Sequence, residues 1–116
     1  MHNFKDLRVW QKVIDLTAEI YSLLSTFPSE EKFGLVSQMK RAAVSIPSNI
    51  AEGAGRNSNK EFKYFLSISL GSLFEIETQL IIANRLELVN IKTTEQLNNT
   101  ISDLQRMIFA SEKTLS

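Results

Sequence analysis

The sequence predicts an all-α protein, an antiparallel up-down-up-down four-helix bundle formed by one domain over residues 1–116. Four segments place apolar residues at three- and four-residue steps, which is the spacing of an amphipathic helix. No segment alternates apolar and polar residues for long, as a half-buried strand would. The connections between the four segments are short, so consecutive helices are expected to run antiparallel. Apolar residues make up 43% of the 116, enough for one core.

The first helix is predicted from about Phe4 to Ser25. It carries two neighbouring apolar stripes, and their combined arc is wider than contact with a single core requires. One stripe consists of Leu7, Trp10, Ile14, Tyr21 and Leu24, and the other of Val9, Val13, Leu16, Ile20 and Leu23. Pro28 then ends the helical region, because a residue that precedes proline avoids helical geometry.

The second helix is predicted from about Glu30 to Ala54, with Ser29 as its N-cap. Glu30 and Glu31 suit the positive end of the helix dipole. The expected core face consists of Val36, Met39, Ala43, Ile46 and Ile50. The stretch GAGRNS contains two glycines, which are expected to end the helix in left-handed conformations.

Pro47 lies in the middle of this second helix. Proline has no N–H to donate to the carbonyl of Ala43 and its ring crowds that turn, so a kink is expected. The hydroxyl of Ser45 or Ser48 is expected to satisfy the freed carbonyl.

Two capping boxes predict the starts of the remaining helices. Ser58 with Glu61 starts a third helix that reaches about Asn84, and Thr93 with Gln96 starts a fourth that ends near Lys113. The expected core face of the third helix is Phe62, Phe65, Leu66, Leu73, Ile76 and Leu80. That of the fourth helix is Leu97, Ile101, Leu104 and Ile108.

Apolar residues also lie on the side of the third helix that faces away from its core face. Small residues among them would let another backbone approach closely, and exposed apolar patches mark interfaces. We therefore predict an oligomer interface made of Tyr64, Ile68, Gly71, Phe74, Thr78 and Ile82. The alternative is a helix that lies centrally within its own bundle.

A polar stripe runs along the second helix, opposite its core face. Its members fall within about 80° of one another by the helical period: Gln38, Arg41, Ser45, Asn49, Glu52 and Arg56. In the structural interpretation, the stripe is solvated surface or joins neighbouring helices through pairs such as Arg41 with Glu52. As a docking surface for RNA or a protein partner, it would use five basic residues for phosphate contacts: Lys40, Arg41, Arg56, Lys60 and Lys63. Residue chemistry alone favours the structural interpretation, since charged stripes are usually solvated.

The chain has few of the residues that usually carry out catalysis. The chain has no cysteine and a single histidine, His2, near a terminus that is expected to fray. We therefore expect no enzyme activity, no catalytic or metal site, no cofactor and no small-molecule substrate. A carboxylate pair between helices, such as Glu52 with Glu75, is the alternative.

Charge and hydropathy limit the partners. The 13 basic and 13 acidic residues balance, so nucleic-acid binding would have to come from a local patch. The N-terminus lacks the apolar core of a signal peptide, and no apolar run of membrane-spanning length stands out. The expected location is the cytoplasm, without a membrane partner.

Three stretches resemble a known family: FKDLRVWQKVIDL, FPSEEKFGLVSQMKRAAVSIPSNIAEGAGRNSNKEF and FLSISLGSLFEIETQL. They are similar to the bacterial four-helix-bundle proteins encoded in intervening sequences of 23S ribosomal RNA genes, the S23 ribosomal protein family. The resemblance covers residues 4–90 and is most specific from Gln38 to Gly53. The family motif falls on Trp10, Pro28, Glu31, Leu35, Gln38, Arg41, Ser45, Asn49, Glu52, Gly53, Gly71, Ser72, Glu75 and Thr78.

The resemblance implies an up-down bundle that assembles into a homopentamer. A related branch comprises the accessory variability proteins of diversity-generating retroelements, in which a basic pentamer partners a reverse transcriptase and binds nucleic acid. The zero net charge of this chain departs from that branch.

The motif positions lead to a hypothesis of one polar network. Ser45 and the motif residues Gln38, Arg41, Asn49 and Glu52 would meet Ser72 and Glu75, either at the oligomer interface or on a surface offered to a partner. The functional expectation is a non-enzymatic, self-assembling binding or scaffold module linked to RNA or a ribonucleoprotein. The alternative is an oligomeric protein–protein adaptor that binds no nucleic acid.

Overall fold

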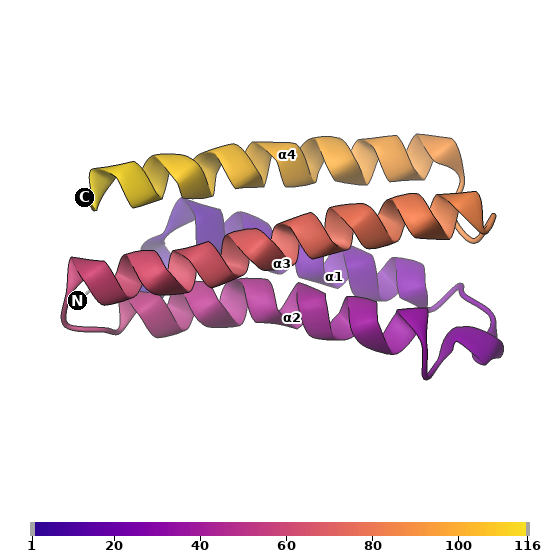
Figure 1. Ribbon diagram of the computed structural model, residues 1–116, viewed down its shortest axis with the longest axis horizontal. Helices are drawn as coiled ribbons and strands as arrows, with labels where there is room; N and C mark the ends of the chain where they lie inside the picture. Colours follow the sequence, from indigo (N-terminus) through magenta and orange to yellow (C-terminus); the bar gives the residue numbers. More distant parts are fainter. Residues whose placement is uncertain (1, 116) are drawn as a thin grey trace.

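A computed structural model describes residues 2–115 of the protein. Over this range the chain forms four α-helices and two short 3-10 helices, and no strand. The α-helices are α1 (Arg8–Leu24), α2 (Leu35–Ala54), α3 (Asn59–Arg85) and α4 (Ile91–Thr114), and the 3-10 helices are η1 (Phe4–Asp6) and η2 (Ser29–Glu31). The all-α class and the four helices are confirmed (Figure 1).

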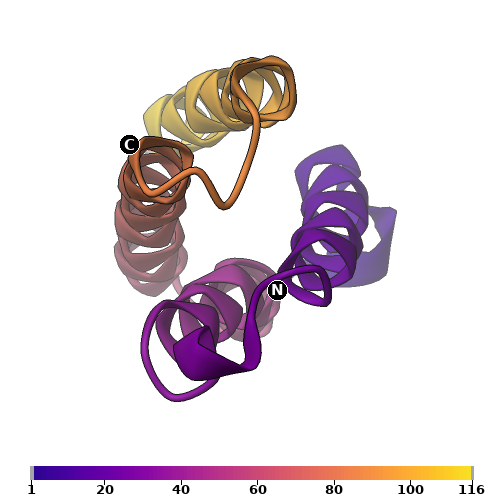
Figure 2. The same ribbon diagram turned by 90° about the vertical axis from the view of Figure 1, so that its right-hand side faces the viewer.

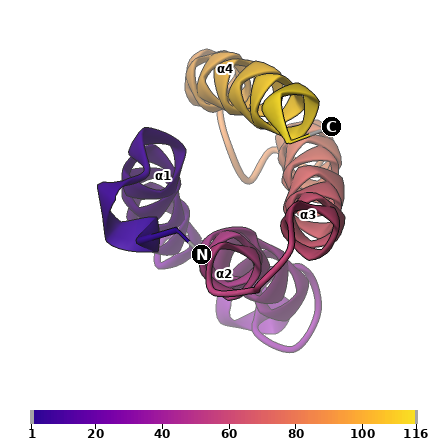
Figure 3. The same ribbon diagram turned by 90° about the vertical axis from the view of Figure 1, so that its left-hand side faces the viewer.

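The four helices surround one core in chain order. Viewed along the bundle, α1 and α3 lie on opposite sides, with α2 and α4 between them (Figures 2 and 3). Packing is most extensive between α2 and α3 and least extensive between α1 and α4. The short connections make successive helices antiparallel, as expected for an up-down-up-down arrangement.

The predicted core faces of α2 and α4 are wholly buried. In α3 the prediction holds except at Phe65, which is half-buried. In α1 the buried residues are four from the predicted stripe of Val9, namely Val9, Val13, Leu16 and Ile20, together with Leu24 from the stripe of Leu7. Leu23 is half-buried, and Ile14 and Tyr21 stay 39% and 40% exposed.

The predicted starts of the first two helices are wrong. Leu7 is extended (φ −75°, ψ 121°), so η1 is separate and α1 begins at Arg8. Ser29 does not cap α2, because the residues after Pro28 close a tight 3-10 turn instead. Gly34 (φ −105°, ψ −110°) is not helical, and α2 begins only after it.

The capping boxes had different outcomes. The hydroxyl oxygen of Ser58 accepts the N–H of Glu61 at 3.1 Å, as predicted. The box of Thr93 with Gln96 is wrong, because the side chain of Asn90 accepts the N–H of Thr93 at 2.8 Å and α4 begins three residues earlier than a Thr93 cap implies. The connection before it contains a non-glycine residue with left-handed backbone, Glu87 (φ 63°).

Gly53 and Gly55 do not adopt left-handed conformations, contrary to the prediction. Gly53 is buried inside α2, where an added Cβ would lie 2.7 Å from the Cβ of Phe65 and 3.2 Å from the carbonyl oxygen of Phe62. Gly55 has φ −81°, and its added Cβ would meet its nearest neighbours at 3.7 Å. Glycine is therefore needed at position 53 because α3 approaches closely there, whereas position 55 has room for a larger residue.

His2 is not frayed, contrary to the expectation. Its backbone N–H donates to the carbonyl oxygen of Ala54 at 2.8 Å, and its ring lies 5.1 Å from that of Phe62. The unpaired carbonyl at the end of α2 provides the acceptor that holds this segment.

Among the described residues, α3 alone is long and apolar enough to cross a membrane, with an 18-residue window of mean hydropathy 1.4. This corrects the expectation that no such segment exists. A core helix passes the same test, and α3 packs against both α2 and α4.

We predict that only one of two alanine substitutions, two residues apart, lowers stability. Gly53→Ala forces a Cβ against Phe65, and overpacking of this kind costs about 1–3 kcal/mol of the free energy of unfolding, more than the ~1 kcal/mol gained in helix propensity. Gly55→Ala is the matched control and should stay within about 0.5 kcal/mol of wild type. Urea unfolding measures both. Equal stability of Gly53→Ala and wild type would contradict the close-approach account.

Candidate functional site

Pro47 is buried in α2, at the level where three helices exchange hydrogen bonds. The carbonyl of Ala43, deprived of its usual donor, lies 3.3 Å from the hydroxyl of Thr17 on α1. That hydroxyl has one hydrogen, which it shares between Ala43 and the carbonyl of Val13 in its own helix, at 2.9 Å, so the contact with Ala43 is the longer branch. The expectation that Ser45 or Ser48 would satisfy Ala43 is wrong, because Ser45 bonds to Ser72 and the hydroxyl that reaches Ala43 belongs to the neighbouring helix.

Hydroxyl groups of α3 meet the same region of α2 from the other side. Ser69, which is fully buried, donates to the carbonyl of Ile46 at 2.8 Å. Ser72, 5% exposed, shares a 2.9 Å hydrogen bond with Ser45. The side-chain amide of Asn49 donates to the hydroxyl of Ser45 at 3.0 Å and to its carbonyl at 2.8 Å. Since Asn49 donates to Ser45, the hydrogen of Ser45 is free for Ser72.

A polar hollow of about 350 Å³ opens beside these bonds, between α2 and α3. Its lining consists of Gln38, Arg41, Ala42, Ser45, Ser72, Glu75 and Gln79. The geometry thus brings most members of the hypothesised network to one place. Arg41 and Glu75 nevertheless form no ion pair within residues 2–115, and the side-chain oxygen of Gln79 is buried without a hydrogen-bond partner there.

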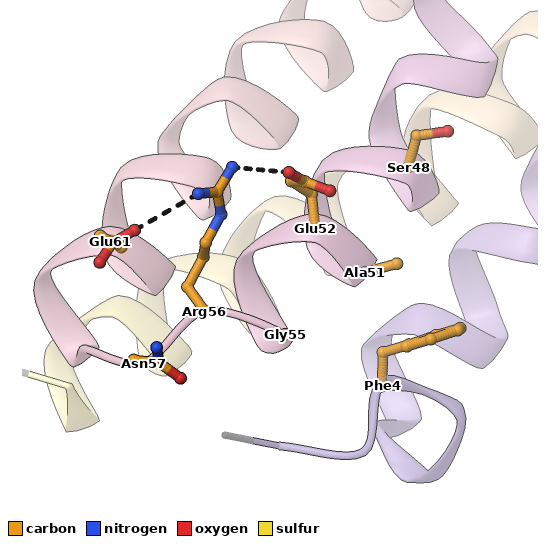
Figure 4. A pocket seen from close by; sticks show the side chains of 8 residues that line it. All are labelled: Phe4, Ser48, Ala51, Glu52, Gly55, Arg56, Asn57 and Glu61. Carbon is orange, nitrogen blue, oxygen red and sulfur yellow. Dashed lines mark hydrogen bonds and ion pairs between the residues drawn. The ribbon is translucent and has the colours of Figure 1, made fainter.

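Glu52 belongs to a different hollow, of about 590 Å³, near the turn between α2 and α3 (Figure 4). There the guanidinium of Arg56 lies between two carboxylates, 2.6 Å from Glu52 and 3.6 Å from Glu61. Glu52 therefore pairs with Arg56 rather than Arg41. The alternative of a carboxylate pair also fails, because Glu52 and Glu75 line separate hollows.

The five predicted phosphate-binding residues do not form one patch. The ammonium of Lys40 lies over the ring of Tyr21 on the α1 side, at 5.2 Å, whereas Arg41 faces α3. Arg56 is paired with two carboxylates and also stacks over Phe65, at 4.9 Å. Lys60 lines a third hollow together with Arg56, Glu61, Tyr64 and Phe65, so Arg56 and Lys60 are neighbours, and Lys63 is half-buried on α3.

The six residues predicted as an oligomer interface form what we call the α3 outer face. Tyr64, Phe74 and Ile82 are 63%, 46% and 45% exposed, and Ile68 is half-buried. Gly71 has no atom within 4 Å of an added Cβ, and it lines a hollow of about 320 Å³ with Phe74, Glu75, Thr78 and Gln79. Because these side chains are exposed, the alternative prediction that α3 is buried on all sides within its own bundle is wrong.

Sequence reasoning missed several residues of these sites. Ile81 lies one helical repeat of seven residues beyond Phe74 and is 46% exposed, so the spacing contained its signal. The roles of Thr17, Ser69 and Gln79 could not be predicted, because they depend on the register between helices, which local sequence patterns do not give. No group of three or more potential metal ligands occurs among the described residues.

These observations define a class: an antiparallel four-helix bundle with a polar seam around a buried proline and an exposed apolar helix face. The sequence profile of the 23S rRNA-intervening sequence proteins matches residues 5–110. The chain belongs to that family, which confirms the resemblance of its sequence.

A solved structure has the same fold. It is the 1.70 Å crystal structure of a protein with unknown function from the S23 ribosomal protein family of Bacteroides thetaiotaomicron VPI-5482. It is 26% identical, with a TM-score of 0.84, and the alignment covers 90% of this chain and 95% of that one. No curated protein matches the chain significantly.

A double-mutant cycle tests the role of Thr17. Thr17→Val keeps the side-chain shape but leaves the carbonyl of Ala43 without a donor, at an expected cost of about 1–3 kcal/mol. In a Pro47→Ala background, residue 47 regains its N–H and the same change should cost less than about 0.5 kcal/mol. Chemical denaturation of the four variants gives the coupling energy, and equal costs in both backgrounds would contradict the assignment.

Proposed function

We propose that the protein is a non-enzymatic, self-assembling helical bundle that acts as a binding or scaffold module in the cytoplasm. The observation that carries this proposal is the α3 outer face. Its large side chains Tyr64, Phe74 and Ile82 are about half exposed or more, and α3 contains an apolar stretch of membrane-spanning length. Contiguous exposed apolar patches mark protein interfaces.

The occupant that we propose for this face is a second copy of the chain. Gly71 and Thr78 leave space between the apolar side chains for a neighbouring helix to approach. The family resemblance supports five copies as the assembly. The hydrogen bonds of Ser45, Asn49 and Ser72 lie within one chain, so we assign that part of the polar network to holding α3 against α2.

RNA binding is the second candidate function, and a specific surface favours it. Tyr64, 63% exposed, lies beside Lys60 in a mainly apolar hollow of about 570 Å³. An exposed aromatic ring next to basic side chains suits stacking of an unpaired base with phosphate contacts. The pairing of Arg56 with two carboxylates and the zero net charge argue against the strongly basic mode of the retroelement branch. Without RNA binding, the module is a protein–protein adaptor.

The assembly proposal predicts a mass. Light scattering at micromolar concentration should give a multiple of the chain mass, five copies in our proposal. Phe74→Asp should lower that mass, because a carboxylate cannot be buried unpaired at low cost. Thr100→Asp on α4, exposed in the hollow between α4 and α1, is the control and should leave the mass unchanged. A wild-type mass of one chain would refute the proposal.

The RNA candidate predicts a salt dependence. Titration with single-stranded RNA at about 50 and 200 mM salt should show affinity falling roughly 10- to 20-fold if about three phosphates are contacted. Lys60→Glu should weaken binding, whereas the same charge reversal at exposed Lys92, on α4, should not. Absence of binding at the lower salt would eliminate this candidate and leave the adaptor function.

A further inference from the structure

The polar hollow between α2 and α3, which we call the α2–α3 hollow, has a hydrogen-bonded floor and two walls that are not hydrogen-bonded. On the floor, Ser45 and Ser72 share the 2.9 Å bond between the helices, and Ser72 is only 5% exposed. The walls carry four longer polar side chains: Gln38, Arg41, Glu75 and Gln79. These four side chains form no hydrogen bond and no ion pair within residues 2–115.

The antiparallel packing of α2 and α3 (Figure 3) arranges these side chains in two pairs at successive levels. One turn from the bond of Ser45 with Ser72, toward the start of α2 and the end of α3, Arg41 is level with Glu75. Gln38 and Gln79 share the next level in the same direction. The α2 wall therefore offers a guanidinium and an amide, and the α3 wall offers a carboxylate and an amide.

The α3 wall suits a positively charged donor. The side-chain oxygen of Gln79 is buried and accepts no hydrogen bond within residues 2–115, although buried polar atoms are normally hydrogen-bonded. The terminal torsion of glutamine is broad, so this oxygen can turn toward the hollow that Gln79 lines. Glu75 lies one turn before Gln79 and adds a carboxylate without an ion-pair partner in the same range. An ammonium group can donate to both.

The α2 wall suits a negatively charged group. Arg41 is exposed, and no carboxylate of residues 2–115 pairs with it. It differs in this respect from Arg56, which lies between Glu52 and Glu61. A guanidinium binds a carboxylate through two parallel hydrogen bonds. The amide of Gln38, one turn away on the same wall, can donate a further one.

The size of the α2–α3 hollow limits the ligand. Its volume of about 350 Å³ lies at the lower end of the ~300–1,000 Å³ that is usual for small-molecule sites. A compact molecule that carries both charges fits the two walls. A single charge would leave one wall without a partner.

We propose that the α2–α3 hollow binds a small α-amino acid in its zwitterionic form. The carboxylate of the ligand contacts Arg41 and Gln38 on α2. Its ammonium group contacts Glu75 and the side-chain oxygen of Gln79 on α3. All four residues belong to one chain, so the site depends neither on self-assembly nor on RNA binding, and it adds recognition of a small molecule to the proposed function.

Ligand-observed NMR titration with L-serine tests the site, together with two derivatives that each lack one charge. L-serinamide keeps the ammonium group and lacks the carboxylate, whereas N-acetyl-L-serine keeps the carboxylate and lacks the ammonium group. The wild type should bind L-serine roughly tenfold more tightly than either derivative, because each derivative loses one charge-assisted contact.

Two substitutions should each remove one of these preferences. Arg41→Gln should bind L-serine and L-serinamide equally, and Glu75→Gln should bind L-serine and N-acetyl-L-serine equally. Both side chains are exposed, so thermal unfolding followed by circular dichroism should be unchanged. Arg8→Gln on α1 and Glu95→Gln on α4, also exposed, are the matched controls and should keep both preferences.

Three results would overturn the inference: no binding of L-serine at millimolar concentration, equal affinity of the wild type for all three compounds, or wild-type preferences in both Arg41→Gln and Glu75→Gln. If these variants lower the mass measured by light scattering and the wild type binds no L-serine, Arg41 and Glu75 pair between copies. That outcome overturns the site and leaves self-assembly standing. A monomeric wild type with the expected preferences refutes self-assembly and supports the site.

Discussion

Gly53 of α2 lies where any side chain would collide with Phe65 of α3, so the two helices can pack this closely here only because that side chain is missing. Further along the same pair, small hydroxyl residues continue the close contact, with Ser69 bonded to the Ile46 carbonyl and Ser72 to Ser45. The buried Pro47 lies between these bonds. On the opposite side, the carbonyl of Ala43, which the proline leaves without its usual donor, lies 3.3 Å from the hydroxyl of Thr17 on α1.

The tight contact between α2 and α3 determines which surfaces remain for function. The small side of α3 is used against α2, and the larger side chains Phe74 and Ile82 point away from the core. α1 likewise leaves Ile14 and Tyr21 outside the core. The self-assembly that we propose rests on these exposed apolar side chains.

The charged residues are also distributed so that few basic side chains lie together on the surface. The zero net charge arises partly from local pairing, most clearly where Arg56 lies between Glu52 and Glu61 at the turn between α2 and α3. Basic residues that are adjacent in sequence, such as Lys40 and Arg41, face different helices. The surface that we propose for RNA is therefore limited to the hollow of Lys60 and Tyr64, which Arg56 and Glu61 also line.

The sequence by itself determined the all-α class, the four helices, most core residues and the family, because apolar periodicity and the Ser58 cap depend on neighbours a few residues away. It also indicated the outward apolar residues of α3, since the helical period separates them from the core face. Only the tertiary structure decided that Thr17 serves the Ala43 carbonyl, that Gly53 is needed for helix approach, and that Glu52 pairs with Arg56 rather than joining Glu75. These contacts depend on the register and distance between helices, which are set by the packing of all four together. The start of α4 differs from these, because Asn90 caps it through the N–H of Thr93 and Asn84 donates to the carbonyl of Val89, both contacts between residues close in the sequence.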